Sequence, residues 1–274
     1  MTYAAEANKA STRRLTLKTL QKMKAEGEKF VTIALYDAPM AAQACDAGAE
    51  VLLVGDSLGM TVLGYDSTLP VTMEHMLYHV EAVARGNSGA IVMGDMPFMS
   101  YATPEQALEN AAKLMRAGAH LVKLEGGEWL AETVRMLSER GIPVCAHLGL
   151  TPQSVNKFGG FLVQGRNEKD ARRLLHDAKT LERAGADLVL LECVPTHVAS
   201  AIAQEVHIPS IGIGAGTGTD AQVLVVNDIL GLTPKPPKFS KNFLLETGSI
   251  GGALKKYVDD VKNGRFPDEE HSFK

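Results

Sequence analysis

Short apolar runs recur along the whole chain, and each is bounded by small or polar residues. Between the runs lie longer segments with apolar positions at helical spacing. This alternation predicts buried parallel strands joined by helices. Eight runs fit strands: VTIALYD (31–37), VLLVGD (51–56), AIVMGD (90–95), LVKLE (121–125), IPVCAHLG (142–149), DLVLLE (187–192), IPSIGIG (208–214) and QVLVVND (222–228).

A weak internal repeat supports this interpretation. Ala-Gly-Ala occurs at 47–49, 117–119 and 184–186, each time after a helical pattern and before an apolar run that ends in an acid. A glycine is the common C-terminal cap of a helix, after which the chain can enter a buried strand. The repeat therefore indicates a recurring helix–strand unit with its acid at the strand's carboxyl end.

Several of the linking segments have clear helical signals. Residues 105–118 follow Thr103-Pro104, which suit the N-cap and the first helical position. Further helices are predicted at 16–27, 129–141, 171–185 and 249–264. The link after the seventh run, TGTDA, is too short for an ordinary helix.

Eight strand–helix units predict a closed (β/α)₈ TIM barrel, with residues 16–27 closing its N-terminal end. We expect one domain over 1–274, with flexible tails at 1–15 and 265–274. The competing fold is an open doubly wound sheet. A dinucleotide-binding sheet of that type would carry G-x-G-x-x-G after its first strand, where this chain has YDAPMAAQ. The glycine-rich GIGAGTG (212–218) follows the seventh run, and no long helix comes after it.

Composition narrows the classes of partner. The chain has 274 residues, 45% hydrophobic and 22% charged, with a net charge of −4 and only 5% aromatics. A nucleic-acid partner is not expected, because phosphate binding needs a basic surface. No membrane span or secretory signal is apparent, so a cytoplasmic location is expected. The three cysteines lack metal-ligand spacing, and we expect buried, reduced thiols.

Polar residues close most of the predicted strands, which is where TIM barrels place their active sites. A single acid at such a position is often only a helix cap. Carboxylates from four strands at one barrel end, however, repel one another unless a cation lies between them. Oxygen ligands without a cysteine pair favour Mg²⁺ over Zn²⁺. The candidates are Asp37, Asp56 with Ser57, Asp95, Lys123 with Glu125, His147, Glu192 and the loop Gly214-Ala215-Gly216.

Longer motifs in the same regions resemble the ketopantoate hydroxymethyltransferase family. The resemblance extends over roughly residues 16 to 250. It rests on GDSLGMTVLGYDSTLPVTMEHMLYHVEAVARG (55–86), GDMPFMSY (94–101), VKLEGG (122–127), HLGLTPQSVNKFGGFLVQGR (147–166), and GIGAG with QVLV and DILG within 212–231.

The resemblance implies a Mg²⁺-dependent transferase. Its members move a one-carbon unit from 5,10-methylenetetrahydrofolate to 3-methyl-2-oxobutanoate through a Mg-stabilised enolate. The product is 2-dehydropantoate, on the way to pantothenate. The resemblance also implies a large homo-oligomer, typically a decamer.

The resemblance assigns roles to individual residues. Asp56 and Asp95 match Mg²⁺ ligands that also touch the substrate, and Glu125 matches a third acid near the metal. Ser57 and Lys123 match substrate-binding groups. Glu192 matches the proton acceptor, and His147 lies in the same pocket of the family.

Two stretches depart from the family pattern. The chain has Ala34-Leu35-Tyr36-Asp37 where the family has Thr-Ala-Tyr-Asp, and Asp220-Ala221-Gln222 where it has Asp-Gly-Gln. An alanine in place of that glycine requires a negative φ or is strained. Two other functions remain open: a lyase of the same barrel group, which would use a reactive cysteine in a gating loop, and a sensor that binds a ketoacid without turnover.

Overall fold

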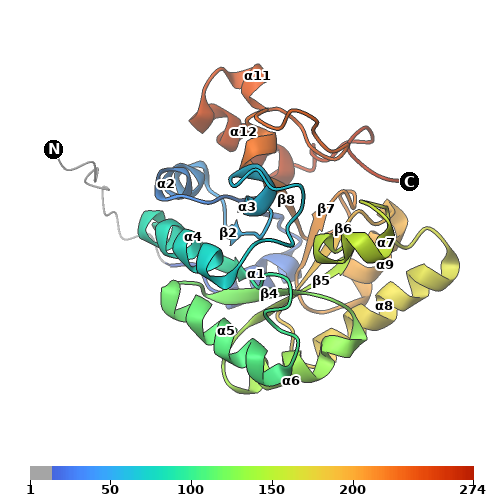
Figure 1. The fold of residues 1–274 in the computed structure, drawn as a ribbon. Coiled ribbons are helices and arrows are strands. Elements are labelled where there is room, and N and C mark those ends of the chain that lie inside the picture. Colours follow the sequence, from blue (N-terminus) through green and yellow to red (C-terminus); the bar gives the residue numbers. More distant parts are fainter. Residues whose placement is uncertain (1–13) are drawn as a thin grey trace.

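Eight short and almost wholly buried strands form the centre of the structure, a computed structural model that describes residues 14–274. The strands are parallel, and β1 to β8 pair in chain order to close a barrel (Figure 1). This confirms the predicted (β/α)₈ barrel over an open sheet. The strands are β1 Phe30–Ala34, β2 Val51–Val54, β3 Ile91–Asp95, β4 Leu121–Glu125, β5 Val144–Gly149, β6 Leu188–Glu192, β7 Ser210–Ile213 and β8 Ala221–Val225.

The first of the longer helices lies at one end of the barrel, and the others surround the barrel and cover its outer face (Figure 1). The longer helices are α1 Leu17–Glu26, α2 Ala38–Ala47, α4 Met73–Gly86, α5 Pro104–Ala117, α6 Ala131–Glu139, α8 Glu168–Arg183, α9 Thr196–Glu205 and α12 Ile250–Lys262. Shorter turns of helix lie in the connections: α3 Leu58–Thr61, η1 Glu128–Leu130, η2 Pro152–Ser154, α7 Val155–Phe158, α10 Val226–Ile229 and α11 Leu244–Thr247.

The Ala-Gly-Ala repeat has the predicted role at the helix ends. Gly48 caps α2 and Gly118 caps α5, with left-handed φ values of 95° and 114°. An L side chain rarely adopts such a φ, so glycine suits the turn into the next strand. At the start of α5, Thr103 Oγ1 accepts a hydrogen bond from the Gln106 backbone N–H.

Helix α1 packs at the barrel end opposite the strand carboxyl ends, as predicted for a closing helix. Leu20 is fully buried. Lys24 Nζ donates hydrogen bonds of 2.9 Å to the Ala203 carbonyl and to Asp220 Oδ2, just before β8. Ala221 begins β8 without a positive φ, so the alanine that departs from the family pattern is not strained.

Two predicted strands end three residues earlier than expected. The first stops at Ala34, and Asp37 caps α2 by accepting a hydrogen bond of 2.8 Å from the Met40 N–H. The eighth stops at Val225, and Val226–Ile229 turn into a helix instead. The extended predictions over 31–37 and 222–228 were wrong at their ends, because apolar residues continue past the point where the chain leaves the barrel.

Residues 265–274, expected to form a flexible tail, instead pack against the barrel. Phe266 is 4% exposed, and its ring meets those of Phe243 and Tyr257 edge-on. The Phe273 carbonyl accepts hydrogen bonds of 3.0 Å from the Thr196 N–H and hydroxyl. The other predicted tail, 1–15, lies outside the described residues except for its last two. Within residues 14–274, no helix has the length and apolar character to cross a bilayer.

Candidate functional site

The register of the barrel brings the predicted polar residues together. Asp95 pairs with Lys123 across β3 and β4, and Glu125 pairs with His147 across β4 and β5. Glu192 pairs with Gly149, two residues beyond His147. Because side chains alternate along a strand, Lys123 and Glu125 point to the same side, as predicted.

Three carboxylates form a buried cluster at this end of the barrel. Asp56, Asp95 and Glu125 are each less than 5% exposed, and each offers an oxygen within 4.8 Å of the others. Burial, followed by repulsion from Asp95 and Glu125, raises the pKa of Asp56 well above its ordinary value. The three carboxylates therefore need positive charge close by if they are all to be ionised.

Lys123 supplies part of that charge. Its buried Nζ lies 2.6 Å from Asp95 Oδ2 and 3.3 Å from Glu125 Oε1. Burial lowers the pKa of Lys123, but Asp95, Glu125 and Asp56 together raise it well above its ordinary value. The amine is thus a stable cation. With all three carboxylates ionised, the group would still carry two excess negative charges.

The cluster has the features of a metal site for a hard divalent cation. Asp95 Oδ1 is buried and has no hydrogen-bond partner among residues 14–274. Such an acceptor is costly unless a ligand or an ion meets it. A divalent cation would both balance the excess charge and occupy the unpaired oxygen. Oxygen donors of this kind suit Mg²⁺ and its relatives.

Gln153 organises this cluster and was not predicted as a site residue. Its Nε2 donates to Asp56 Oδ2 at 2.8 Å, and its backbone N–H donates to Glu125 Oε2 at 3.0 Å. Its Oε1 accepts a hydrogen bond from the Tyr101 hydroxyl. Gln153 lies in the turn η2 beyond β5, so a search of strand ends could not find it. The available signal was its place in the motif at 147–166.

His147 lies between two carboxylates. Its Nδ1 is 3.3 Å from Glu125 Oε1 and its Nε2 is 3.3 Å from Glu192 Oε2. Neither contact has the angles of a good hydrogen bond. Burial, and then Lys123, lower the pKa of His147, but contacts with Glu125 and Glu192 outweigh them and raise it. The imidazole therefore connects the acidic cluster to Glu192.

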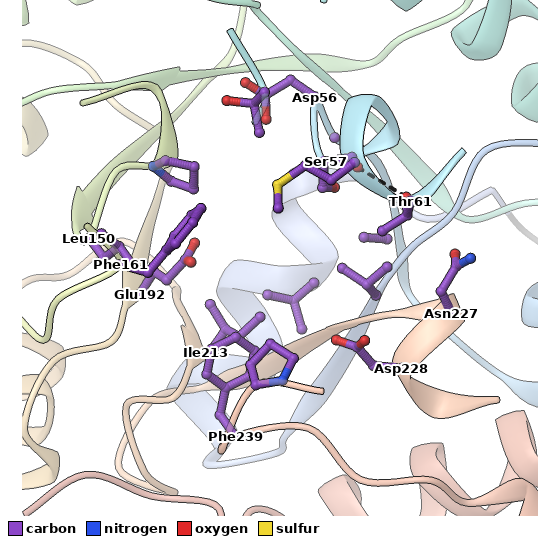
Figure 2. Close-up of a pocket in the computed structure, with 18 of the residues that line it drawn as sticks. Asp56, Ser57, Thr61, Leu150, Phe161, Glu192, Ile213, Asn227, Asp228 and Phe239 are labelled. Atoms are coloured by element: carbon purple, nitrogen blue, oxygen red, sulfur yellow. Dashed lines mark hydrogen bonds between the residues drawn. The ribbon is translucent and has the colours of Figure 1, made fainter. Parts of the chain in front are cut away.

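Ser57 is held next to the cluster at the start of α3. Its hydroxyl shares a hydrogen bond of 2.9 Å with the Tyr36 hydroxyl, and its carbonyl accepts one from Thr61 Oγ1 (Figure 2). Ser57 and Asp56 thus face the same space from the end of β2. Of the predicted candidates, Asp37 is not in this group, because its carboxylate caps α2.

A single cavity of about 920 Å³ joins these residues. Asp56, Ser57, Asp95, Lys123, Glu125, His147 and Glu192 all line it. Figure 2 shows Asp56 and Ser57 on one side, and Asn227 and Asp228 on another, with Phe161, Leu150 and Glu192 facing them. Asn227 and Asp228 close the eighth predicted strand but were not among the predicted site residues, and the structure places them on the short helix α10.

Cys193 bears on the lyase alternative. The three cysteines are free, and Cys145 and Cys193 are buried as expected, whereas Cys45 is only partly buried. Cys193 follows β6 and lines the cavity, which the sequence had not indicated. Burial, and then the charge of Glu192, raise the pKa of its thiol. This environment opposes the thiolate that a reactive cysteine needs.

Solved structures with a similar fold include several enzymes of one barrel group. Phosphonopyruvate hydrolase in complex with oxalate and Mg²⁺ matches with a TM-score of 0.60 at 14% identity, over 94% of this chain and 93% of that one. A 2,3-dimethylmalate lyase matches with a TM-score of 0.56 at 15% identity, over 90% and 95%. At these identities the likeness concerns the fold alone.

Relatives by sequence are much more similar. A protein of Saccharophagus degradans named 3-methyl-2-oxobutanoate hydroxymethyltransferase is 67% identical over 261 residues, 95% of this chain and 97% of the relative. One of Marinobacter nauticus with the same name is 59% identical over 95% and 99%. The model of the ketopantoate hydroxymethyltransferase family matches residues 14–269. This chain therefore belongs to the ketopantoate hydroxymethyltransferase family, whose members are hydroxymethyltransferases.

Proposed function

We propose that this protein transfers a hydroxymethyl unit from 5,10-methylenetetrahydrofolate to 3-methyl-2-oxobutanoate, forming 2-dehydropantoate. The observation that supports it most is the position of Glu192. This carboxylate lines the same cavity as the buried acidic cluster and is joined to it through His147. A base facing a site that can bind a ketoacid is what removal of a proton beside a carbonyl requires.

Asp56 and Asp95, with Glu125 close by, would hold Mg²⁺, as the unpaired oxygen of Asp95 and the excess negative charge favour. The ion would act as a Lewis acid that makes the C3 proton of the ketoacid more acidic. Gln153 keeps Asp56 and Glu125 in place through two hydrogen bonds. Groups that form hydrogen bonds to metal ligands commonly increase the affinity of the site for the metal.

Lys123 and Ser57 would bind and orient the ketoacid. The Lys123 amine is fixed between Asp95 and Glu125, so its charge does not need to reorganise during the reaction. It faces the cavity, where negative charge develops on the oxygen of the enolate. Preorganised charge of this kind is usually the largest contribution to catalysis.

Glu192 would accept the proton from C3. The C–H electron pair stays on the ketoacid as the enolate, which then forms the new bond to the one-carbon unit of the folate. The two C–N bonds that join this carbon to the folate break, and water supplies the hydroxyl oxygen. The proton held by Glu192 and one proton of the water pass to the folate nitrogens, so tetrahydrofolate leaves. His147 Nε2, 3.3 Å from Glu192 Oε2, stabilises the position of this base.

Turnover with both substrates tests the proposal. The Mg²⁺-loaded protein is mixed with 3-methyl-2-oxobutanoate and methylenetetrahydrofolate labelled with ¹³C at the transferred carbon. We expect the label to appear in 2-dehydropantoate in the NMR spectrum. A protein that binds the ketoacid but leaves the label on folate would be a binding protein, as a sensor would be, and would refute the proposal.

A further inference from the structure

Much of the cavity is not needed by the ketoacid. Its volume of about 920 Å³ is near the upper end for pockets of drug-sized ligands, whereas the ketoacid has only five carbons. The residues assigned to ketoacid chemistry lie on β2 to β6. The other walls include the end of β8, α10 and the segment 232–239.

Asp228 is the buried charged group of this second region. It is 6% exposed, and its carboxylate is directed into the cavity from α10 (Figure 2). Thr233 Oγ1 donates a hydrogen bond to Oδ1. No cation within residues 14–274 forms an ion pair with Asp228. A buried carboxylate with one neutral donor retains strong acceptor capacity, and further donors would stabilise it.

The surfaces around Asp228 favour a flat and largely apolar ligand. Ile213 and Phe239 line the cavity across from Asp228, and Asn227 precedes Asp228 on α10 (Figure 2). A second carboxylic acid would be repelled there. The ligand that fits is a planar heterocycle with adjacent N–H donors along one edge, since two parallel N–H groups match the two oxygens of a carboxylate.

The rim of this region has the opposite charge. Lys235 and Lys238 line the cavity at its exposed side. Lys238 Nζ donates to the Ser272 carbonyl at 2.7 Å and lies 5.2 Å from the centre of the Phe273 ring. An anionic group would find two amines here. The region thus combines a buried acceptor with an exposed basic rim.

We propose that this region binds the folate donor, with the 2-amino group and N3–H of the pterin on Asp228 and the glutamate tail near Lys235 and Lys238. This inference rests on the proposed function, because it takes folate as the second substrate. The pattern of charge matches the two ends of that molecule. The pterin would then lie in the same cavity as the ketoacid, so the one-carbon unit can meet the enolate.

Direct binding tests the assignment without requiring turnover. Titration calorimetry measures the affinity of the Mg²⁺-loaded protein for tetrahydrofolate and for 6-methyltetrahydropterin, which lacks the tail. We expect Asp228→Asn to weaken both by about 10- to 100-fold, the range for a lost charge-assisted hydrogen bond. We expect the double variant Lys235→Ala with Lys238→Ala to weaken the binding of tetrahydrofolate and to leave the binding of 6-methyltetrahydropterin unchanged. Asp259→Asn and Lys255→Ala on α12 are matched controls that should change neither affinity.

The C3 proton exchange of 3-methyl-2-oxobutanoate in D₂O, measured without folate, separates this assignment from the proposed function. In Asp228→Asn, the fold-loss of tetrahydrofolate affinity should be at least ten times larger than the fold-change of the ketoacid's proton-exchange rate. Equal tetrahydrofolate affinity in Asp228→Asn and the parent protein would overturn the assignment while leaving the function in place. The lysine variant, at exposed positions, keeps the assignment testable if Asp228→Asn does not fold. If this variant binds tetrahydrofolate as tightly as the parent protein does, the position of the tail is overturned.

Discussion

Asp56 destabilises the protein in the absence of a metal ion. Because burial, and then Asp95 and Glu125, raise the pKa of Asp56, folding favours its protonated form. The stability from this group is present below its ordinary pKa of 3.8 and is lost as the pH rises through the raised value. At neutral pH the ionised cluster therefore opposes folding until a cation binds.

Replacing Asp56 with Asn should separate stability from metal binding. At pH 7 without metal, Asp56→Asn should raise Tm by about 2–4 °C, the shift expected for ~1 kcal/mol. The gain should shrink as the pH falls, since the carboxyl of the parent becomes protonated. Mg²⁺ should stabilise the parent by mass action and leave the variant unchanged.

Thermal unfolding with and without Mg²⁺ measures these effects. Asp46→Asn, at an exposed position of α2, is the matched control and should shift Tm in neither condition. A lower Tm for Asp56→Asn without metal would show that repulsion within the acidic cluster does not destabilise the folded protein.

The sequence revealed the residues whose position follows from alternation along a strand. Asp95 and Glu125 end strands, Lys123 and His147 lie two residues before a strand end, and a parallel barrel gathers such ends at one edge. Gln153 was invisible to this argument, because hydrogen bonds across a turn depend on the fold of the connection and not on any periodicity.

At the scale of elements, the turn η2 acts as a support for the acidic cluster. It follows β5 and places Gln153 over Asp56 and Glu125, while Tyr101 holds the Gln153 carbonyl oxygen. The connection after β3 and the connection after β5 thus meet at the same residue. Both connections must be folded for the cluster to have its geometry.

Gln153→Leu should therefore weaken Mg²⁺ binding. Removing the side-chain amide frees Asp56, and the loss of a group that orients a ligand typically costs 10- to 100-fold in metal affinity. Titration calorimetry with Mg²⁺ measures the change. Ser154→Ala, the next residue of the same turn, should keep the parent's affinity. If Gln153→Leu binds Mg²⁺ as tightly as the parent protein, η2 does not support the metal site.

The elements also show where prediction from sequence stops. Apolar pattern and small-residue turns gave the order and type of the strands and the main helices. They did not give the end of β8, where Val226–Ile229 continue the apolar run as a helix. The direction of the chain at a barrel edge depends on neighbouring strands. The apolar pattern therefore could not show that Asp228 lies on a helix and lines the cavity.

At the scale of the whole molecule, large apolar side chains remain exposed on the outer helices and turns. Tyr78 on α4, Trp129 in η1 and Leu245 on α11 are 70%, 65% and 84% exposed. Tyr and Trp side chains are enriched in interfaces between protein chains. We propose that copies of the chain cover these groups in an assembly, as the resemblance to the family implies.

Sedimentation velocity at micromolar concentration should then give a mass close to ten times the 29.3 kDa of one chain. Tyr78→Ser, which shortens the exposed side chain on α4, should reduce the fraction of the large species if that helix lies in an interface. A homogeneous species of one chain for the parent protein would contradict self-association.

The central claim is that Glu192 takes the C3 proton from a ketoacid held at the acidic cluster. Proton exchange of 3-methyl-2-oxobutanoate in D₂O, followed by NMR with metal-loaded and metal-stripped protein, tests it most directly. We predict metal-dependent exchange in the parent protein. In Glu192→Gln we predict a rate lower by roughly 10²–10⁴, with unchanged Mg²⁺ affinity. Near-normal exchange in Glu192→Gln, or equal exchange without metal, would contradict the account.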